Sequence, residues 1–140
     1  MEFICKDDPR PLIPEAVYAA TCTAYDVNFC FGKCRKLFLN FKIITPGPYL
    51  GTELFMAFAM PYDGKMAQGS KYYKTWVMVN GWQKPTRNAI MSPRIFKNKV
   101  FEVLVRTVKP QHNKNDMPKE FHYSVVDGIL RVNTGTSSNG

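Results

Sequence analysis

Most of this sequence alternates between apolar and polar positions with a period of two, which is the pattern of strands with one buried face. The clearest example is the segment 35–45. Its apolar positions are Leu37, Leu39, Phe41 and Ile43, and the positions between them are Lys36, Phe38, Asn40 and Lys42. This period predicts that the first set packs in a core and that the second set faces away from it.

Four other segments have the composition of strands, and one has the composition of a short helix. Over residues 70–80 the spacing of the apolar residues favours a helix, with Ser70 suited to cap its start and Gly81 suited to end it. Asp127-Gly128 is expected to bend the last strand. The predicted strands are residues 17–28, 35–45, 53–60, 99–109 and 121–132.

Three strands, a helix and two strands follow one another in the order of an OB-fold, a five-stranded, partly closed barrel. The expected fold is therefore mainly β, a five-stranded OB-like barrel with a short helix between strands 3 and 4. Residues 1–12 are expected to form an extended N-terminal arm, and residues 13–132 are expected to form the barrel domain. Residues 133–140 consist of Gly, Ser, Thr and Asn and predict a flexible tail.

The net charge of the chain indicates which class of partner the protein binds. Nineteen Lys and Arg against eleven Asp and Glu give a net charge of +8 on 140 residues. Such an excess favours a polyanionic partner, because neutralising phosphates drives binding that does not depend on sequence. The alternative is that the charge only keeps the protein soluble. No stretch has the pattern of a signal peptide or a membrane span, so a cytoplasmic location without a membrane partner is expected.

Metal binding and catalysis find little support in the residue types. Cys30 and Cys34 have the spacing of half a zinc site, but no second pair is near, and His112 and His122 are about 80 residues away. Free thiols and no cofactor are therefore expected. The sequence contains no nucleophile elbow, phosphate loop or zinc-protease motif, so the chain is not expected to be an enzyme.

The outward face of the segment 35–45 is the best candidate for a binding surface. It places the aromatic Phe38 between Lys36 and Lys42, and single-stranded nucleic acid is bound by such a combination of cations with an exposed ring. Two interpretations of Phe38 remain open: it stacks on a base, or it fills a second small core beneath a loop.

Other cations, several of them next to aromatic residues, extend this candidate surface. For Tyr72 the alternative is a place on the core-facing stripe of the helix, because Tyr72 and Trp76 are four residues apart. The complete set of candidate nucleic-acid-binding residues is Lys33, Arg35, Lys36, Phe38, Lys42, Lys71, Tyr72, Lys74, Arg94, Arg106, Lys109 and Lys114.

Six short motifs spread along the chain resemble those of a group of proteins. They are IPEAVY at 13–18, KLFLNFKI at 36–43, GPYLGTELF at 47–55, MSP at 91–93, VLVRTV at 103–108 and YSVVD at 123–127. These motifs resemble small proteins of bacteriophages and integrative mobile elements, in a layout similar to phage single-stranded-DNA-binding proteins of OB type. The chain departs from the pattern at 15–18, where many members carry a Gly before the Tyr. The resemblance implies a mobile element in a bacterial host cell and assigns no binding residue.

Three hypotheses about function follow. The first is a single-stranded-DNA-binding protein that acts in replication or recombination of a phage or mobile element, together with replication or recombination proteins. The second is a protein-binding adaptor or inhibitor from the same kind of element, whose basic surface meets an acidic partner. The third is an RNA-binding module, which the sequence does not separate from the first. An oligomer is compatible with all three, because exposed strand edges can pair between subunits.

Overall fold

The structure is a computed structural model, and it describes residues 10–29, 35–61, 65–86 and 89–133. Five long strands form one antiparallel sheet with the order β3-β2-β1-β4-β7. The mainly β class and the short helix after the third strand are therefore as predicted. The strands are β1 (Val17–Phe29), β2 (Arg35–Ile43), β3 (Glu53–Met60), β4 (Val100–Val108) and β7 (Tyr123–Val132).

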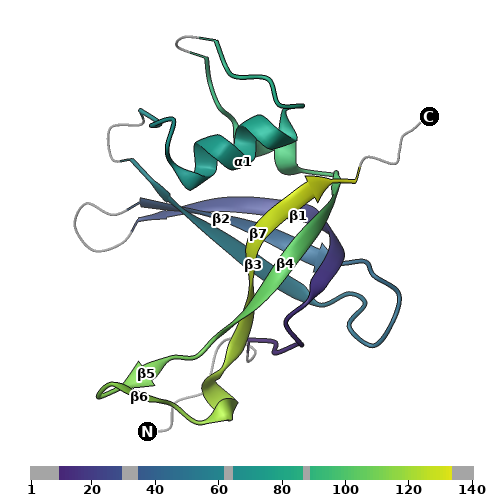
Figure 1. The fold of residues 1–140 in the computed structure, drawn as a ribbon, viewed down its shortest axis with the longest axis vertical. Coiled ribbons are helices and arrows are strands. Elements are labelled where there is room, and N and C mark those ends of the chain that lie inside the picture. Colours follow the sequence, from purple (N-terminus) through teal and green to yellow (C-terminus); the bar gives the residue numbers. More distant parts are fainter. Residues whose placement is uncertain (1–9, 30–34, 62–64, 87–88, 134–140) are drawn as a thin grey trace, which may run out of the picture.

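The sheet is strongly coiled, and α1 (Lys71–Val79) lies across one of its ends (Figure 1). Ser70 caps α1 as predicted, since its Oγ accepts a hydrogen bond from the Tyr73 N–H (3.1 Å). The helix ends before Gly81, whose φ of +73° is a conformation that glycine adopts without steric cost. A 3₁₀-helix, η1 (Pro93–Phe96), precedes β4 in a segment for which the sequence predicted no regular structure.

The core lies between the inner face of the sheet and α1. The alternating residues of β2 point into it, and so do Phe58 of β3 and Phe101 of β4. Rings dominate the packing near α1, where Tyr72 lies edge-on to Phe58 (5.4 Å between ring centroids). Burying such side chains contributes about 1.5–3 kcal/mol each before the entropy cost of ordering them. The coiled sheet is therefore held by apolar packing on its inner side, and its outer side is available for other contacts.

Irregular positions in the ladders bend two of the strands. The register of β1 against β2 shifts between Cys22 and Ala24, and that of β4 against β7 shifts between Leu104 and Val105. The second shift leaves Asp127 unpaired between Val126 and Gly128, which is where the sequence predicted a bend.

The segment between β4 and β7 contains regular structure, although the sequence predicted neither a strand nor a helix between residues 109 and 121. It contains a small hairpin, β5 (Gln111–His112) and β6 (Asn115–Asp116), followed by the 3₁₀-helix η2 (Lys119–Phe121). Figure 1 shows the hairpin projecting from the end of the sheet opposite α1. Asn113 and Lys114 form its turn with φ of +52° and +67°. A two-residue turn of this kind supports pairing without hydrophobic alternation, so the period-two pattern gave no sign of it.

β3 and β7 are the two edges of the sheet, and they approach each other across the coil. The ladder does not continue between them within the described residues, so the sheet is open. No helix in the described parts of the chain has the length and apolar composition needed to cross a membrane.

Candidate nucleic-acid interface

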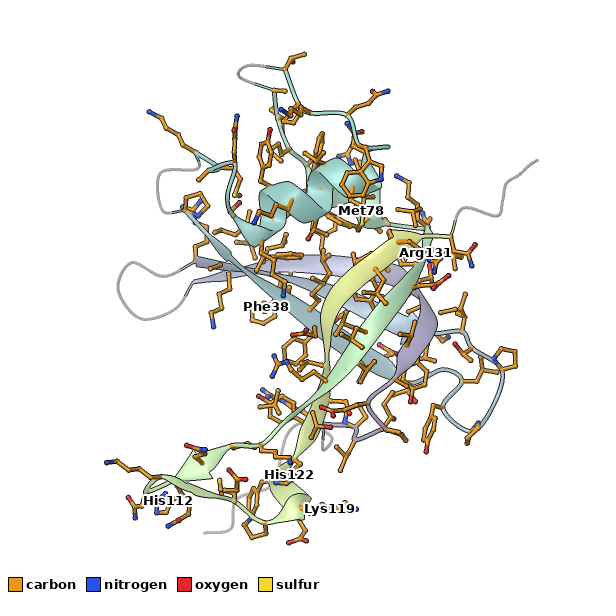
Figure 2. The ribbon with its side chains drawn as sticks, viewed as in Figure 1. Phe38, Met78, His112, Lys119, His122 and Arg131 are labelled. Atoms are coloured by element: carbon orange, nitrogen blue, oxygen red, sulfur yellow. The ribbon has the colours of Figure 1, made fainter. Side chains whose placement is uncertain are left out.

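The outer face of β2 presents the side chains that the sequence analysis singled out. Lys36 and Lys42 are exposed and Phe38 is half-buried, whereas the alternate residues Leu37, Leu39 and Phe41 are fully buried. Figure 2 shows the Phe38 ring projecting from the sheet between α1 and the β5–β6 hairpin. The alternation of β2 therefore separates a core side from a side where two cations flank a ring.

Phe38 packs against a second ring rather than against a core. Its ring lies edge-on to Phe55 of β3, with 5.5 Å between the centroids. Directly across the ladder from Phe38 stand the small Ala57 on β3 and Asp26 on β1. Neither Phe38 nor Phe55 is fully buried, and both lie outside the core cluster. Of the two interpretations of Phe38, the one that makes it part of a second buried core is not what the structure shows.

A third ring and one cation complete this surface. The Arg10 guanidinium carbon lies 4.4 Å from the ring centroid of Tyr123 and 5.5 Å from that of Phe55. Tyr123 begins β7 and Phe55 belongs to β3, so Arg10 spans the gap between the two edges of the sheet. Cation–π contacts of this kind contribute roughly 0.5–2 kcal/mol each. We call Phe38, Phe55 and Tyr123 the aromatic platform.

The charges around the aromatic platform are mixed, with cations in excess. Lys36, Lys42 and Arg10 stand against Asp26, which is opposite Phe38, and Glu53, which is opposite Lys42. The opposite charges of Lys42 and Glu53 face each other across the β2–β3 ladder, which stabilises the strand pairing by a small amount. The excess of positive charge beside the aromatic rings makes this face suited to a ligand that combines flat apolar groups with negative charge.

Sequence reasoning missed Arg10, Phe55 and Tyr123 as members of this surface. The period of two in the segment 53–60 could have placed Phe55 outside, because Leu54, Met56 and Phe58 point inward. For Arg10 no sequence signal exists. Its position depends on the hydrogen bonds that hold the arm against β7.

Three of the predicted residues lie apart from the aromatic platform and make contacts within the protein. The Lys71 Nζ donates to the Asp127 carbonyl oxygen (2.7 Å) and lies 5.7 Å from the centroid of the Phe58 ring. The Arg106 Nε donates to Asp127 Oδ1 (2.9 Å). Lys71 and Arg106 therefore both contact Asp127, Lys71 at the carbonyl oxygen and Arg106 at the carboxylate. Arg35 is half-buried at the start of β2.

Tyr72 is a correction, because it belongs to the core and not to a binding surface. Its side chain is 1% exposed and packs against Phe58 and Phe96. The hydroxyl donates to the Met91 carbonyl oxygen (2.6 Å), and burial raises the pKa of the phenol far above its ordinary value. The helical spacing of Tyr72 and Trp76 therefore marks the inner, buried stripe of α1.

The remaining predicted residues are exposed and spread over the molecule. Lys74 lies on α1 and Arg94 in η1, at the end that α1 covers, and Lys109 and Lys114 lie toward the β5–β6 hairpin. Lys33 falls outside the described residues, as do Cys30 and Cys34. In the part of the chain that the structure describes, no group of three or more His, Cys, Asp or Glu side chains could hold a metal ion.

Comparison with known proteins adds no relative to this geometry. No protein-family model matches the chain, and no curated protein matches it.

Proposed function

We propose that the chain is a single-stranded-DNA-binding protein of OB type, which acts without catalysis in replication or recombination of a phage or mobile element in the bacterial cytoplasm. The strand order β3-β2-β1-β4-β7, with a helix between the third and fourth long strands, supports the OB topology. The proximity of β3 and β7 supports a partly closed barrel. OB-folds bind single strands on the face of their second and third strands, which here are β2 and β3.

The aromatic platform is the observation that supports this proposal most. Single strands expose the flat faces of their bases, and stacking on an aromatic side chain contributes about 1–3 kcal/mol per base with little sequence preference. Phe38 and Phe55 offer such rings on neighbouring strands. Lys36, Lys42 and Arg10 surround them with positive charge for the phosphates. Duplex DNA buries its base faces and could use only the cations.

Fluorescence anisotropy with matched labelled oligonucleotides tests this function. We expect single-stranded DNA to bind at least tenfold more tightly than duplex of the same length at about 0.1 M salt, because only the single strand can stack. Equal affinity for single-stranded and duplex DNA would show that the surface binds polyanions in general and does not stack on bases. Tighter binding of the RNA version would move the assignment to RNA, since only the 2′-hydroxyl distinguishes that strand's backbone.

A second candidate function, binding of an acidic protein, is favoured by a different surface. Trp82 follows α1 with its side chain 74% exposed and its backbone at φ +63°, a strained conformation for such a residue. It lines a groove of about 310 Å³ with Met78, Leu130 and Arg131. Figure 2 shows Met78 and Arg131 at the α1 end of the molecule. Trp, Met and Arg are enriched at protein interfaces, and the net charge of +8 favours an acidic partner over a second copy of this chain.

The two functions separate in one experiment on Trp82→Ala and Phe38→Ala. If the chain binds DNA, Phe38→Ala weakens binding and Trp82→Ala leaves it unchanged. If the chain is a protein adaptor, wild type retains a defined acidic protein from the host or phage in a pull-down that oligonucleotides do not compete. The Trp82→Ala variant is then expected not to retain that protein in the pull-down.

A further inference from the structure

A groove beside α1 lies on a surface that the proposed DNA site does not use. Its volume is about 630 Å³, and it is formed by the end of β3, the segment before α1, α1 itself and the segment before η1. Three methionines, Met60, Met66 and Met91, line it together with Tyr73 and Ile90. We call it the methionine groove. It has no residue in common with the aromatic platform or with the groove at Trp82.

The methionine groove exposes apolar surface that the fold leaves partly uncovered. Met60, Met66, Tyr73 and Met91 pack against the core with part of their surface accessible. The Ile90 side chain is 86% exposed. Apolar surface gathered in one groove is typical of an interaction site. Methionine suits such a site, because its unbranched and flexible side chain adapts to irregular partners.

Hydrogen bonds hold one wall of the groove against α1. The Tyr72 hydroxyl donates to the Met91 carbonyl oxygen (2.6 Å), and the Trp76 Nε1–H donates to the Ser92 carbonyl oxygen (3.0 Å). Both donors belong to the buried stripe of α1. The fold itself therefore positions this wall, which lowers the entropy cost of binding a ligand there.

The net charge of the protein belongs to the segment that forms this groove. Residues 65–99, which include α1 and η1, contain eight Lys and Arg and no Asp or Glu. The rest of the chain contains eleven Lys and Arg and eleven Asp and Glu, so this segment accounts for the whole net charge of +8. We call residues 65–99 the basic cap. Figure 1 shows its described parts at the end of the molecule opposite the β5–β6 hairpin.

The methionine groove therefore combines apolar walls with a positive field. All of its lining residues except Met60 belong to the basic cap, and none of them is Asp or Glu. The exposed Lys65 places a cation directly at the groove. At about 0.1 M salt the field of exposed charges extends roughly 10 Å, so the other cations of the cap also attract an approaching anion.

We propose that the methionine groove binds an acidic segment of another protein, whose spaced apolar side chains enter the groove. Charge complementarity selects this partner, because its Asp and Glu meet the basic cap while its Leu or Phe side chains cover the methionines. A second copy of this chain is a poor partner there, since the two basic caps repel each other.

Nucleic acid suits the methionine groove less well than an acidic peptide does. Tyr73 is the only ring of the groove that is not buried, and the methionines and Ile90 offer no flat face on which bases stack. The inference goes beyond the proposed function and does not rest on it. The groove and the aromatic platform are separate surfaces, so the protein can hold DNA and the peptide at the same time.

Fluorescence anisotropy with labelled synthetic peptides tests this inference. In the probe peptide, Leu and Phe recur at intervals of three and four positions among Asp and Glu. A second peptide has Ser in place of Leu and Phe, and a third has Lys in place of Asp and Glu. We expect only the probe to bind saturably at about 0.1 M salt, because it alone has both the charge and the apolar side chains. Equal binding of the Ser or the Lys peptide, or no binding of the probe, would overturn the inference.

Two glutamate substitutions locate the bound probe. Ile90→Glu adds a negative charge at the groove without loss of buried contacts, since Ile90 is 86% exposed. The matched control is Leu50→Glu, which changes a 60% exposed residue in the turn at the opposite end of β3 from Met60. We expect Ile90→Glu to bind the probe roughly tenfold more weakly than Leu50→Glu. Equal binding by the two variants, or loss of binding in Trp82→Ala alone, would contradict this location.

A competition experiment separates this inference from the proposed function. A saturating thymidine oligomer should leave binding of the probe unchanged, and Ile90→Glu should bind the oligomer as tightly as Leu50→Glu does. Displacement of the probe by the oligomer would show that nucleic acid occupies the basic cap and would overturn the inference. If wild type binds no oligomer, the proposed function fails, and binding of the probe still decides whether the groove takes an acidic peptide.

Discussion

Phe38 and Phe41 are three residues apart on β2, and their side chains lie on opposite faces of the sheet. The Phe41 ring is completely buried and packs edge-on to Phe101 (5.9 Å between centroids), whereas Phe38 is half-buried on the outer face in a T-shaped contact with Phe55 (5.5 Å). The same side chain thus serves the core at one position and is available to a ligand at the other. The difference comes from the pleat of the strand, which directs odd and even positions to opposite sides.

Replacing each of these rings with Ala distinguishes their roles. Phe38→Ala should weaken single-stranded-DNA binding about 5- to 150-fold, the equivalent of one stacked base, with little change in the free energy of unfolding. Phe41→Ala should destabilise the protein by about 3–5 kcal/mol. Urea unfolding and anisotropy on the same samples measure both effects. A loss of several kcal/mol in Phe38→Ala would show that this ring is structural.

Cys22 makes stability depend on pH in the alkaline range. Burial in the core raises the pKa of its thiol to about 11. The unfolded chain ionises this thiol at lower pH than the folded protein does, so its contribution to stability is complete below about pH 9 and is lost as pH rises toward 11. Buried Tyr72 acts in the same direction at higher pH.

Cys22→Ala isolates this effect. The difference in unfolding free energy between wild type and Cys22→Ala should shrink between pH 8 and 11, by about 1.4 kcal/mol per unit of pKa shift. Urea denaturation at several pH values measures it, and the other titrating groups cancel in the comparison. A difference that stays constant with pH would show that the folded thiol ionises as readily as the unfolded one.

At the scale of elements, hydrogen bonds between segments that are distant in sequence hold the candidate binding surface together. The arm is joined to β7 through Ser124 and Ile13, which are 111 residues apart. Ser124→Ala would leave the Ile13 N–H and carbonyl without this partner, at a cost of about 1–3 kcal/mol. Because the arm bears Arg10, which contacts Phe55 and Tyr123 of the aromatic platform, we expect this variant to bind DNA more weakly than wild type.

Ser70→Ala is the matched control, since it removes the cap of α1 and costs about 1 kcal/mol at a site far from the arm. Both variants should unfold at lower urea concentration, and anisotropy should report weaker binding for Ser124→Ala alone. Similar binding by the two variants at temperatures where both are folded would contradict a role of the arm in the site.

Local patterns predicted the elements far better than they predicted the site. The alternation in β2 and the Ser70 cap are encoded within a few residues, so they were readable from the sequence. The Arg10–Tyr123 contact depends on tertiary packing between distant segments, and no periodicity reports it. For Tyr72, the basic and aromatic neighbours in sequence predict a surface position, but the four-residue spacing to Trp76 places it on the buried stripe of α1.

At the scale of the whole molecule, the charge determines how binding responds to salt. The net charge is +8, but the cations are dispersed, and Lys71 and Arg106 are engaged at Asp127. Only some of the cations therefore face the aromatic platform. The logarithm of affinity for single-stranded DNA should fall linearly with the logarithm of salt concentration, with a slope near 2 if the three cations Arg10, Lys36 and Lys42 each bind one phosphate.

A salt titration by anisotropy, between about 0.05 and 0.3 M, measures this slope. Affinity that does not change with salt would exclude phosphate binding. A slope much above this value would mean that cations away from the aromatic platform also contact the strand.

The central claim, that single-stranded DNA binds on the outer face of β2 and β3, is tested most directly by NMR. Amide chemical shifts of the isotopically labelled protein are followed during titration with a thymidine oligomer. We predict that the largest changes lie on β2 and β3 around Phe38 and Phe55 and extend to Arg10 and Tyr123, while α1 and Trp82 remain unchanged. Changes centred on Trp82 and Leu130, or no saturable changes at low salt, would contradict the account.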